Sequence, residues 1–127
     1  MGRFLLICLG GAAGTGARYA LGTWLHRWLG MAFPYGTLAV NALGSFVISV
    51  VMYAALTKGL LSEDARLVTV TGVLGGFTTY SSFNFETLRL LHGGALGLGL
   101  VNIGATLLGC LVAGAAGLAT ARLAFGA

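Results

Sequence analysis

The stretch "GVLGGFTTYSSFNFET", residues Gly72–Thr87, places five consecutive polar side chains behind two adjacent glycines in an otherwise apolar chain. Glycine is a poor helix former, and Ser and Thr hydroxyls compete for backbone hydrogen bonds. We therefore expect a helix to break near Gly75–Thr79. Non-helical backbone at membrane depth must be buried in protein or face water. The break could be a kink filled by neighbouring helices, or it could free carbonyls that hold a small cation.

The composition around this stretch is that of a membrane protein. The chain has 127 residues, of which 57% are hydrophobic and only 8% are charged, whereas soluble domains are about 25% charged. Three runs lack Asp, Glu, Lys and Arg: Trp28–Thr57, Leu67–Phe85 and Leu90–Ala121. The N-terminus resembles a secretory signal, but its apolar pattern continues to Trp24, which favours a first membrane helix. We expect one all-α transmembrane domain over residues 1–127.

Four membrane spans fit the chain, joined by short connections that imply antiparallel neighbours. They run roughly over Phe4–Trp28, Tyr35–Thr57, Arg66–Leu91 and Ala95–Arg122, with the third span broken near its middle. Ser62 is the expected N-cap before the third span. Both termini then lie on one side, and that side carries four Lys or Arg residues against two on the other. This bias gives only a weak orientation by the positive-inside rule.

Several function classes find no support in the sequence. The net charge of +4 is spread thinly, with no basic cluster for nucleic acid. Cys8 and Cys110 have no metal-ligand spacing and are interpreted as small core residues. A catalytic triad, a carboxylate pair and a phosphate-binding loop are all missing, so we do not expect an enzyme. Many of the 22 glycines recur at helical spacing, which indicates close helix packing in lipid.

Two spans carry polar residues four positions apart, which places each set on one helix face. The second span has Thr37, Asn41, Ser45 and Ser49, and the fourth has Asn102, Thr106 and Cys110. Each residue alone could simply bond its own helix or a neighbouring one. Two aligned stripes instead favour a polar track along the membrane normal.

Aromatic and charged residues near the break suggest which ion such a track would carry. Tyr80 and Phe83 share one helix face. Aromatic residues at this spacing usually pack in a core. Their ring edges carry partial positive charge, however, and can contact an anion. Arg18, inside the first span, could reach the surface or face a vestibule. Glu86 could pair with Arg89 on the helix surface or lie at a pore mouth.

Three motifs, together with four spans in 127 residues, resemble the Fluc (CrcB-type) family of fluoride channels over essentially the whole chain. They are "GGAAGTGARY" (Gly10–Tyr19), "GTLAVNALGSF" (Gly36–Phe46) and "GVLGGFTTYSSF" (Gly72–Phe83). The resemblance implies an antiparallel, dual-topology homodimer in the cell (inner or plasma) membrane. It also implies two pores that export fluoride passively and protect the cell from it.

The resemblance also assigns roles to individual residues. Asn41 would line the pore, Phe83 would be the second pore phenylalanine, and Tyr80 would occupy the place of the first, which is usually Phe. Backbone carbonyls of Gly75 and Thr78 would hold a structural sodium ion, the one cofactor implied, between two subunits. Arg18 and Glu86 would lie in vestibules. The fluoride pore would then be lined by Asn41, Ser45, Thr79, Tyr80, Ser81, Ser82, Phe83, Asn102 and Thr106.

Three other functions remain open at this stage. A small multidrug antiporter would need an intramembrane carboxylate in its first span, where this chain carries Arg18. A structural membrane subunit would not require two polar stripes and a broken helix. A fluoride/proton exchanger of another fold would make flux depend on the pH gradient. The expected partners are fluoride, sodium, membrane lipid and a second copy of the chain, and not nucleic acid.

Overall fold

A computed structural model describes residues 1–126, which are helical apart from short connections and contain no β-strand. Helix α1 covers Gly2–Leu29, and α2 covers Tyr35–Met52 and continues as a π-helical turn over Tyr53–Thr57. The third predicted span begins with α3, a π-helical segment and α4, which cover Glu63–Leu67, Val68–Leu74 and Gly75–Phe77. It resumes as α5, Tyr80–His92, and α6 covers Leu96–Phe125.

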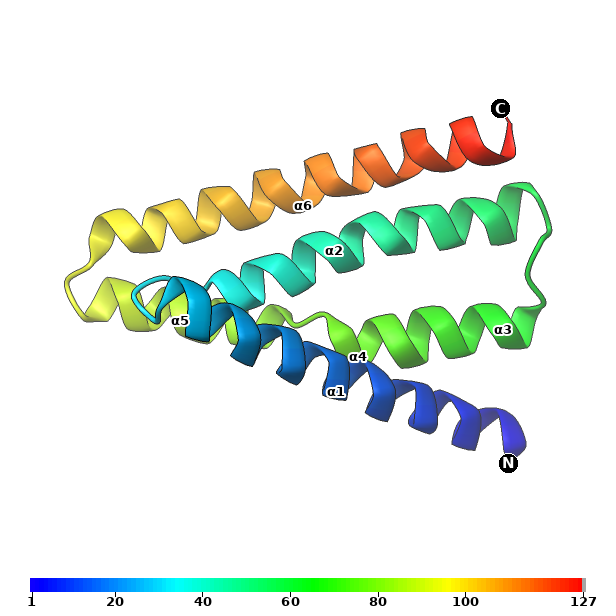
Figure 1. The fold of residues 1–127 in the computed structure, drawn as a ribbon, viewed down its shortest axis with the longest axis horizontal. Helices are drawn as coiled ribbons and strands as arrows, with labels where there is room; N and C mark the ends of the chain where they lie inside the picture. Colours follow the sequence, from blue (N-terminus) through cyan, green and yellow to red (C-terminus); the bar gives the residue numbers. More distant parts are fainter. Residues whose placement is uncertain (127) are drawn as a thin grey trace.

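Three of these helical stretches are long and apolar enough to cross a membrane: Gly2–Leu29, Tyr35–Thr57 and Leu96–Phe125. The interrupted segment from α3 to α5 runs beside them from one end of the molecule to the other (Figure 1). Both chain ends lie at the same end of the molecule, together with the α2–α3 connection (Figure 1). The four-helix arrangement is therefore confirmed, with the third predicted span present as two unequal helical parts.

The helix ends follow local sequence signals. Gly30 ends α1 with φ 80°, and Gly94 has φ 83° in the α5–α6 connection; glycine takes this left-handed conformation at no steric cost. Ser62 accepts a 3.2 Å hydrogen bond from the Ala65 amide, which confirms it as the N-cap of α3.

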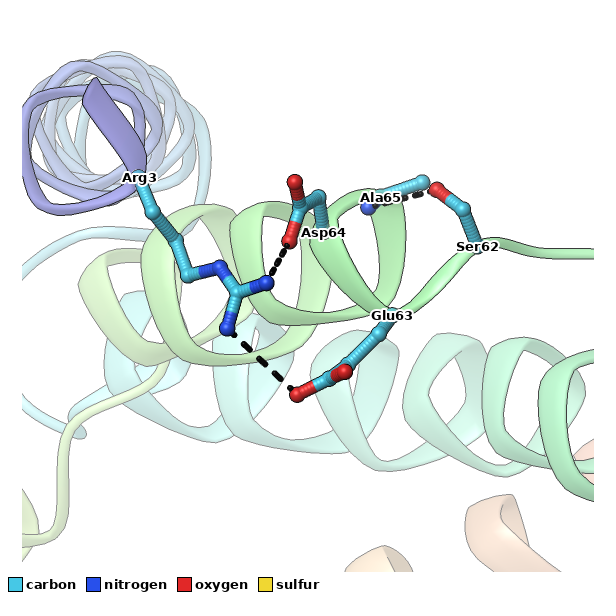
Figure 2. Close-up of polar contacts among 5 residues, drawn as sticks. All are labelled: Arg3, Ser62, Glu63, Asp64 and Ala65. Carbon is cyan, nitrogen blue, oxygen red and sulfur yellow. Dashed lines mark hydrogen bonds and ion pairs between the residues drawn. The ribbon is translucent and has the colours of Figure 1, made fainter.

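An ion cluster ties the beginning of α1 to the beginning of α3. Figure 2 shows Arg3 of α1 extending toward two consecutive carboxylates. One guanidinium nitrogen of Arg3 lies 2.6 Å from an oxygen of Asp64, and the other lies 3.5 Å from an oxygen of Glu63. All three side chains are more than half exposed, so water weakens these pairs, and they fix position more than they add stability.

Glycines let α1 lie directly against the first part of the interrupted segment. A Cβ built on Gly72 would lie 2.8 Å from the Ile7 carbonyl oxygen, and one built on Gly76 would overlap the Gly11 carbonyl. From the other side, a Cβ on Gly14 would overlap the backbone of Val73. The spacing of four between these glycines is thus used for backbone-to-backbone contact, as helix association in lipid requires.

Helix α6 packs against α2 in the same manner. A Cβ on Gly117 of α6 would lie 3.0 Å from the carbonyl carbon of Phe46 in α2. Val40 of α2 and Asn102 of α6 are each only 1% exposed. As a result α2 lies between α6 and the interrupted segment (Figure 1), and a cavity between these three elements borders the break.

Candidate functional site

The chain leaves the helical conformation at two residues, Thr78 (φ −85°, ψ 158°) and Thr79 (φ −155°, ψ 109°). The Thr78 hydroxyl donates a 2.9 Å hydrogen bond to the Leu74 carbonyl. The Thr79 hydroxyl accepts a 3.2 Å hydrogen bond from the Ser82 amide and so caps α5. The helix break predicted near Gly75–Thr79 is therefore confirmed, because two hydroxyls satisfy the backbone on either side of it.

The side chain of Asn41 holds the break from α2. Its Nδ2 donates to the Thr79 carbonyl oxygen at 3.0 Å, and its Oδ1 accepts from the Thr79 amide at 2.7 Å. Thr79 is only 8% exposed, so no other element would readily satisfy these backbone groups. The carboxamide is thereby fixed in orientation, and one N–H of its amino group is left beyond the bond to Thr79.

Three hydroxyls gather at the beginning of α5. The Thr79 hydroxyl donates to the Ser82 hydroxyl at 3.0 Å, and the hydroxyls of Thr79 and Ser81 lie 3.4 Å apart. This cluster lies at a helix N-terminus, where the backbone dipole carries partial positive charge. The arrangement therefore combines hydroxyl groups with a positive helix end and contains no cationic side chain.

A cavity of about 510 Å³ opens where α2, the break and α6 converge. None of the side chains that line it is charged. Eight residues expected to act at the site border it: Asn41, Ser45, Gly75, Thr78, Thr79, Tyr80, Phe83 and Thr106. Residues from helices that are distant in sequence thus line one cavity. The spacing of residues within each helix could not predict this meeting.

The two aromatic rings at this cavity form a pair with different surroundings. Their centroids lie 5.5 Å apart, and the ring planes are inclined by 59°. Phe83 is buried at 6% exposure, whereas Tyr80 is 75% exposed. Phe83 therefore belongs to the wall of the cavity within one chain, while most of the Tyr80 ring faces outward.

Helix α6 contributes one polar atom without a partner. Thr106, only 8% exposed, borders the cavity, and its hydroxyl oxygen is buried and has no hydrogen-bond partner among residues 1–126. Asn102, one turn earlier, does not border the cavity and instead donates to the Thr87 hydroxyl at 2.9 Å. The sequence analysis did not predict a role for Thr87, whose hydroxyl donates to the Phe83 carbonyl at 2.7 Å. Its position four residues after Phe83 places both residues on one helix face and could have indicated this contact.

Four other predicted residues lie away from this cavity. Ser81 is exposed and Ser82 is half-buried in the hydroxyl cluster. Arg18 is half-buried and has neither a hydrogen bond nor an ion pair within residues 1–126. Glu86 accepts a 2.9 Å hydrogen bond from Thr37 of α2, and its other carboxylate oxygen is buried and has no partner within the described chain.

Two of the polar residues on α2 bond to their own helix, as the simpler interpretation of the stripe predicted. Ser45 and Ser49 each donate to the carbonyl four residues earlier, at 2.7 Å and 3.1 Å, so their hydroxyls are bound to their own helix. The interpretation of both cysteines as core residues is wrong. Cys8 is exposed on α1, whereas Cys110 is half-buried and lines the cavity, because α6 turns its polar stripe toward α2.

No cluster of three His, Cys, Asp or Glu residues in the described chain could hold a metal ion. Backbone oxygens remain as candidate ligands. Because α4 ends at Phe77 and the Thr79 amide is bonded to Asn41, the carbonyl of Gly75 loses the amide that would bond it in a continuous helix. Gly75 is also exposed, and backbone carbonyls are among the oxygen ligands that hard cations take.

Long apolar helices, an interrupted segment between them and a cavity with uncharged polar walls define a multi-pass membrane protein of the cell membrane. The family described as CrcB-like protein, Camphor Resistance (CrcB), matches residues 5–118. The chain is 54% identical over 122 residues to the fluoride-specific ion channel FluC of Sorangium cellulosum, and the match covers 96% of each chain.

Two further relatives carry the same name, fluoride-specific ion channel FluC. The protein of Anaeromyxobacter sp. (strain K) is 51% identical over 113 residues, which are 89% of this chain and 90% of the relative. The protein of one strain of Thermus thermophilus is 52% identical over 112 residues, which are 87% of each chain. The chain therefore belongs to the CrcB (FluC) family, and the resemblance drawn from its motifs is confirmed.

Proposed function

We propose that this protein is a fluoride-selective ion channel, and not an enzyme, that lets fluoride leave the cell passively across the membrane. The observation that carries the proposal is the cavity beside the helix break, whose polar lining is uncharged and offers hydroxyl and amide groups. Membership of a family whose relatives are named fluoride-specific channels points to the same ion. The position of this cavity between membrane-spanning helices supports a conducting path rather than a closed binding pocket.

Fluoride is small and strongly hydrated, so a path must replace its water without trapping it. Thr106 offers a hydroxyl with no competing partner, and Asn41 offers the N–H that Thr79 leaves unused. Phe83 offers a ring edge with partial positive charge. These groups attract an anion weakly, whereas a Lys or Arg in the same place would hold it. Ser45 is a weaker candidate, because its hydroxyl is already bonded to the Asn41 carbonyl.

The other predicted residues would extend the proposed path beyond this cavity. Ser81, Ser82 and Thr79 would receive the ion at the positive end of α5. Arg18 and Glu86 would lie in vestibules, where Arg18 attracts anions. Asn102 acts at a distance, because its contact with Thr87 supports the helix that carries Phe83.

The proposal includes an antiparallel, dual-topology homodimer with a structural sodium ion. Tyr80 and Gly75 are exposed in one chain although they border the site, and a second copy would cover them. Carbonyls of Gly75 and Thr78 from both subunits would supply the oxygen ligands that sodium prefers. The ion would add fixed positive charge near the break and hold the two interrupted segments together.

Fluoride efflux from liposomes loaded with potassium fluoride tests the function. A fluoride electrode should record rapid release only after valinomycin is added, while chloride is retained, because a passive anion path is electrogenic. Thr106→Val should lower fluoride efflux about tenfold by removing a hydroxyl that meets the ion. Thr120→Val is the matched control, since the Thr120 hydroxyl bonds to the Ala116 carbonyl of α6 and is exposed.

Other outcomes identify the rival functions. Release without valinomycin that follows a pH gradient would indicate fluoride/proton exchange. Proton-driven movement of an organic cation would indicate a multidrug antiporter. No fluoride release from folded protein would leave a structural membrane subunit and would refute the channel. Equal efflux from the Thr106 and Thr120 variants would remove Thr106 from the path while leaving the channel in place.

A further inference from the structure

Gly44 lies in the middle of α2, three residues after Asn41, and borders the cavity beside the helix break. It is buried, and neither the polar stripe of α2 nor the proposed path gives it a role. Glycine in the interior of a helix is unfavourable, because it loses more backbone entropy than any other residue. The reason for a glycine at this position must therefore lie in what packs against it.

The side chain of Thr78 fills the space that a side chain at Gly44 would need. A Cβ built on Gly44 would overlap the Cγ2 methyl group of Thr78. The next nearest atoms, Cδ1 of Phe77 and Cβ of Thr78, would lie 3.7 Å away, which is an ordinary van der Waals distance. One methyl group of a residue at the break is thus packed against the bare backbone of α2.

Hydrogen bonds on both sides keep this methyl group from moving aside. The Thr78 hydroxyl donates to the Leu74 carbonyl at 2.9 Å, so turning the side chain to move its methyl group would break that bond. A shift of the backbone would instead strain the two bonds between Asn41 and the next residue, Thr79. A methyl group added at Gly44 would therefore displace the peptide at the break.

We propose that Gly44 is a positioning residue of the fluoride path, which by having no side chain receives the Thr78 methyl group and so fixes the peptide that joins Thr78 to Thr79. The inference rests on the proposed function, because both threonines border the cavity of the proposed path. The same peptide carries the amide that Asn41 binds and the carbonyl proposed as a sodium ligand. Helix α2 then holds the break in two ways, through a carboxamide at Thr79 and a glycine at Thr78.

This contact differs from the glycine contacts at Gly76 and Gly117, where backbone meets backbone. A Cβ on Gly76 would overlap the Gly11 carbonyl, and one on Gly117 would lie 3.0 Å from the carbonyl carbon of Phe46. No change of a single side chain relieves such contacts.

At Gly44 the overlap is with one side-chain methyl group. Thr78→Ser removes that methyl group and keeps the hydroxyl that bonds to Leu74. The second substitution should therefore relieve the effect of a methyl group added at Gly44, which gives the inference a test by rescue.

Fluoride efflux from liposomes and hydrogen exchange of the Thr79 amide, both measured on the full-length protein, test the inference. Gly44→Ala should lower the efflux rate about tenfold, because the displaced peptide disturbs the path. Its Thr79 amide should exchange faster, because the bond to Asn41 is weakened. Gly16→Ala is the matched control: the space around a Cβ at Gly16 is open, so both quantities should equal those of the parent protein.

The double variant provides the rescue. Gly44→Ala combined with Thr78→Ser should show the same efflux rate and the same amide exchange as Thr78→Ser alone, because the added methyl group takes the place of the one removed. If Gly44→Ala lowers efflux equally in the parent and in the Thr78→Ser background, the inference is overturned. If Gly44→Ala alone does not fold, the double variant should fold, and a double variant that stays unfolded would overturn the inference as well.

The remaining outcomes separate this inference from the proposed function. Parent-like efflux and exchange in Gly44→Ala would overturn the inference, and so would a change in only one of the two quantities. Absence of fluoride efflux from the parent protein would count against the channel function instead. The exchange of the Thr79 amide would then still show whether Gly44 fixes the peptide at the break.

Discussion

Replacing Asn41 with alanine tests whether this side chain holds the helix break. The change removes both hydrogen bonds to Thr79, the 3.0 Å bond to its carbonyl and the 2.7 Å bond from its amide. Thr79 is 8% exposed and lies between two helices, so neither backbone group regains full contact with solvent. The variant therefore measures how much free energy of unfolding is lost when the backbone amide and carbonyl of Thr79 have no hydrogen-bond partner.

The magnitude follows from the number of groups left unpaired. A buried donor or acceptor that loses its partner costs about 1–3 kcal/mol, so two such groups cost about 2–6 kcal/mol. Water in the adjacent cavity can replace part of the lost bonding. We therefore expect Asn41→Ala to lower the free energy of unfolding by about 2–4 kcal/mol, in the lower part of that range.

Reversible unfolding in mixed detergent micelles, followed by circular dichroism, measures this difference. Ser49→Ala is the matched control on the same helix, because the Ser49 hydroxyl bonds only to the Ser45 carbonyl of that helix. We expect the control to stay within about 0.5 kcal/mol of the parent protein. If Asn41→Ala unfolds at the same free energy as Ser49→Ala, the view that Asn41 secures the break is refuted.

Two further predictions concern the interrupted segment. Gly76→Ala should lower the free energy of unfolding by about 1–3 kcal/mol, because the new methyl group would overlap the Gly11 carbonyl and push α1 away. Gly16→Ala should not lower it, because the space around a Cβ at Gly16 is open. Thermal unfolding of the two variants measures the difference, and equal stability would contradict the close contact at Gly76. Ser62→Ala should lower the free energy of unfolding by about 0.5–2 kcal/mol, because it removes the N-cap of α3. Amide hydrogen exchange should become faster in the first turn of α3 only. Unchanged exchange there would contradict the capping role.

The position of the helix break could be predicted because its causes are local. Adjacent glycines weaken the helix, and the hydroxyls of Thr78 and Thr79 supply substitutes for the lost backbone bonds. Its main support could not be predicted. Asn41 belongs to another helix, α2. The spacing of residues within α2 does not determine which of them lies level with the break, so the pairing of Asn41 with Thr79 could not be predicted.

The polar stripe of α2 illustrates the same limit. Helical periodicity correctly placed Thr37, Asn41, Ser45 and Ser49 on one face, but the structure gives them three kinds of partner. Thr37 bonds to Glu86, Asn41 bonds to Thr79, and the two serines bond to carbonyls of their own helix. Which residues of a stripe keep free hydroxyls depends on the packing of the neighbouring helices, as the unpartnered Thr106 on α6 also demonstrates.

The hold of Asn41 on Thr79 has a consequence for how the protein is made. A ribosome completes α2 before it reaches the interrupted segment, because α2 precedes that segment in the chain. The carboxamide that satisfies Thr79 is therefore synthesised before the extended peptide unit, and it is available to pair that unit when the two meet in the bilayer. Helix α2 thus carries, ahead of the least regular part of the chain, the side chain that this part needs to satisfy its backbone.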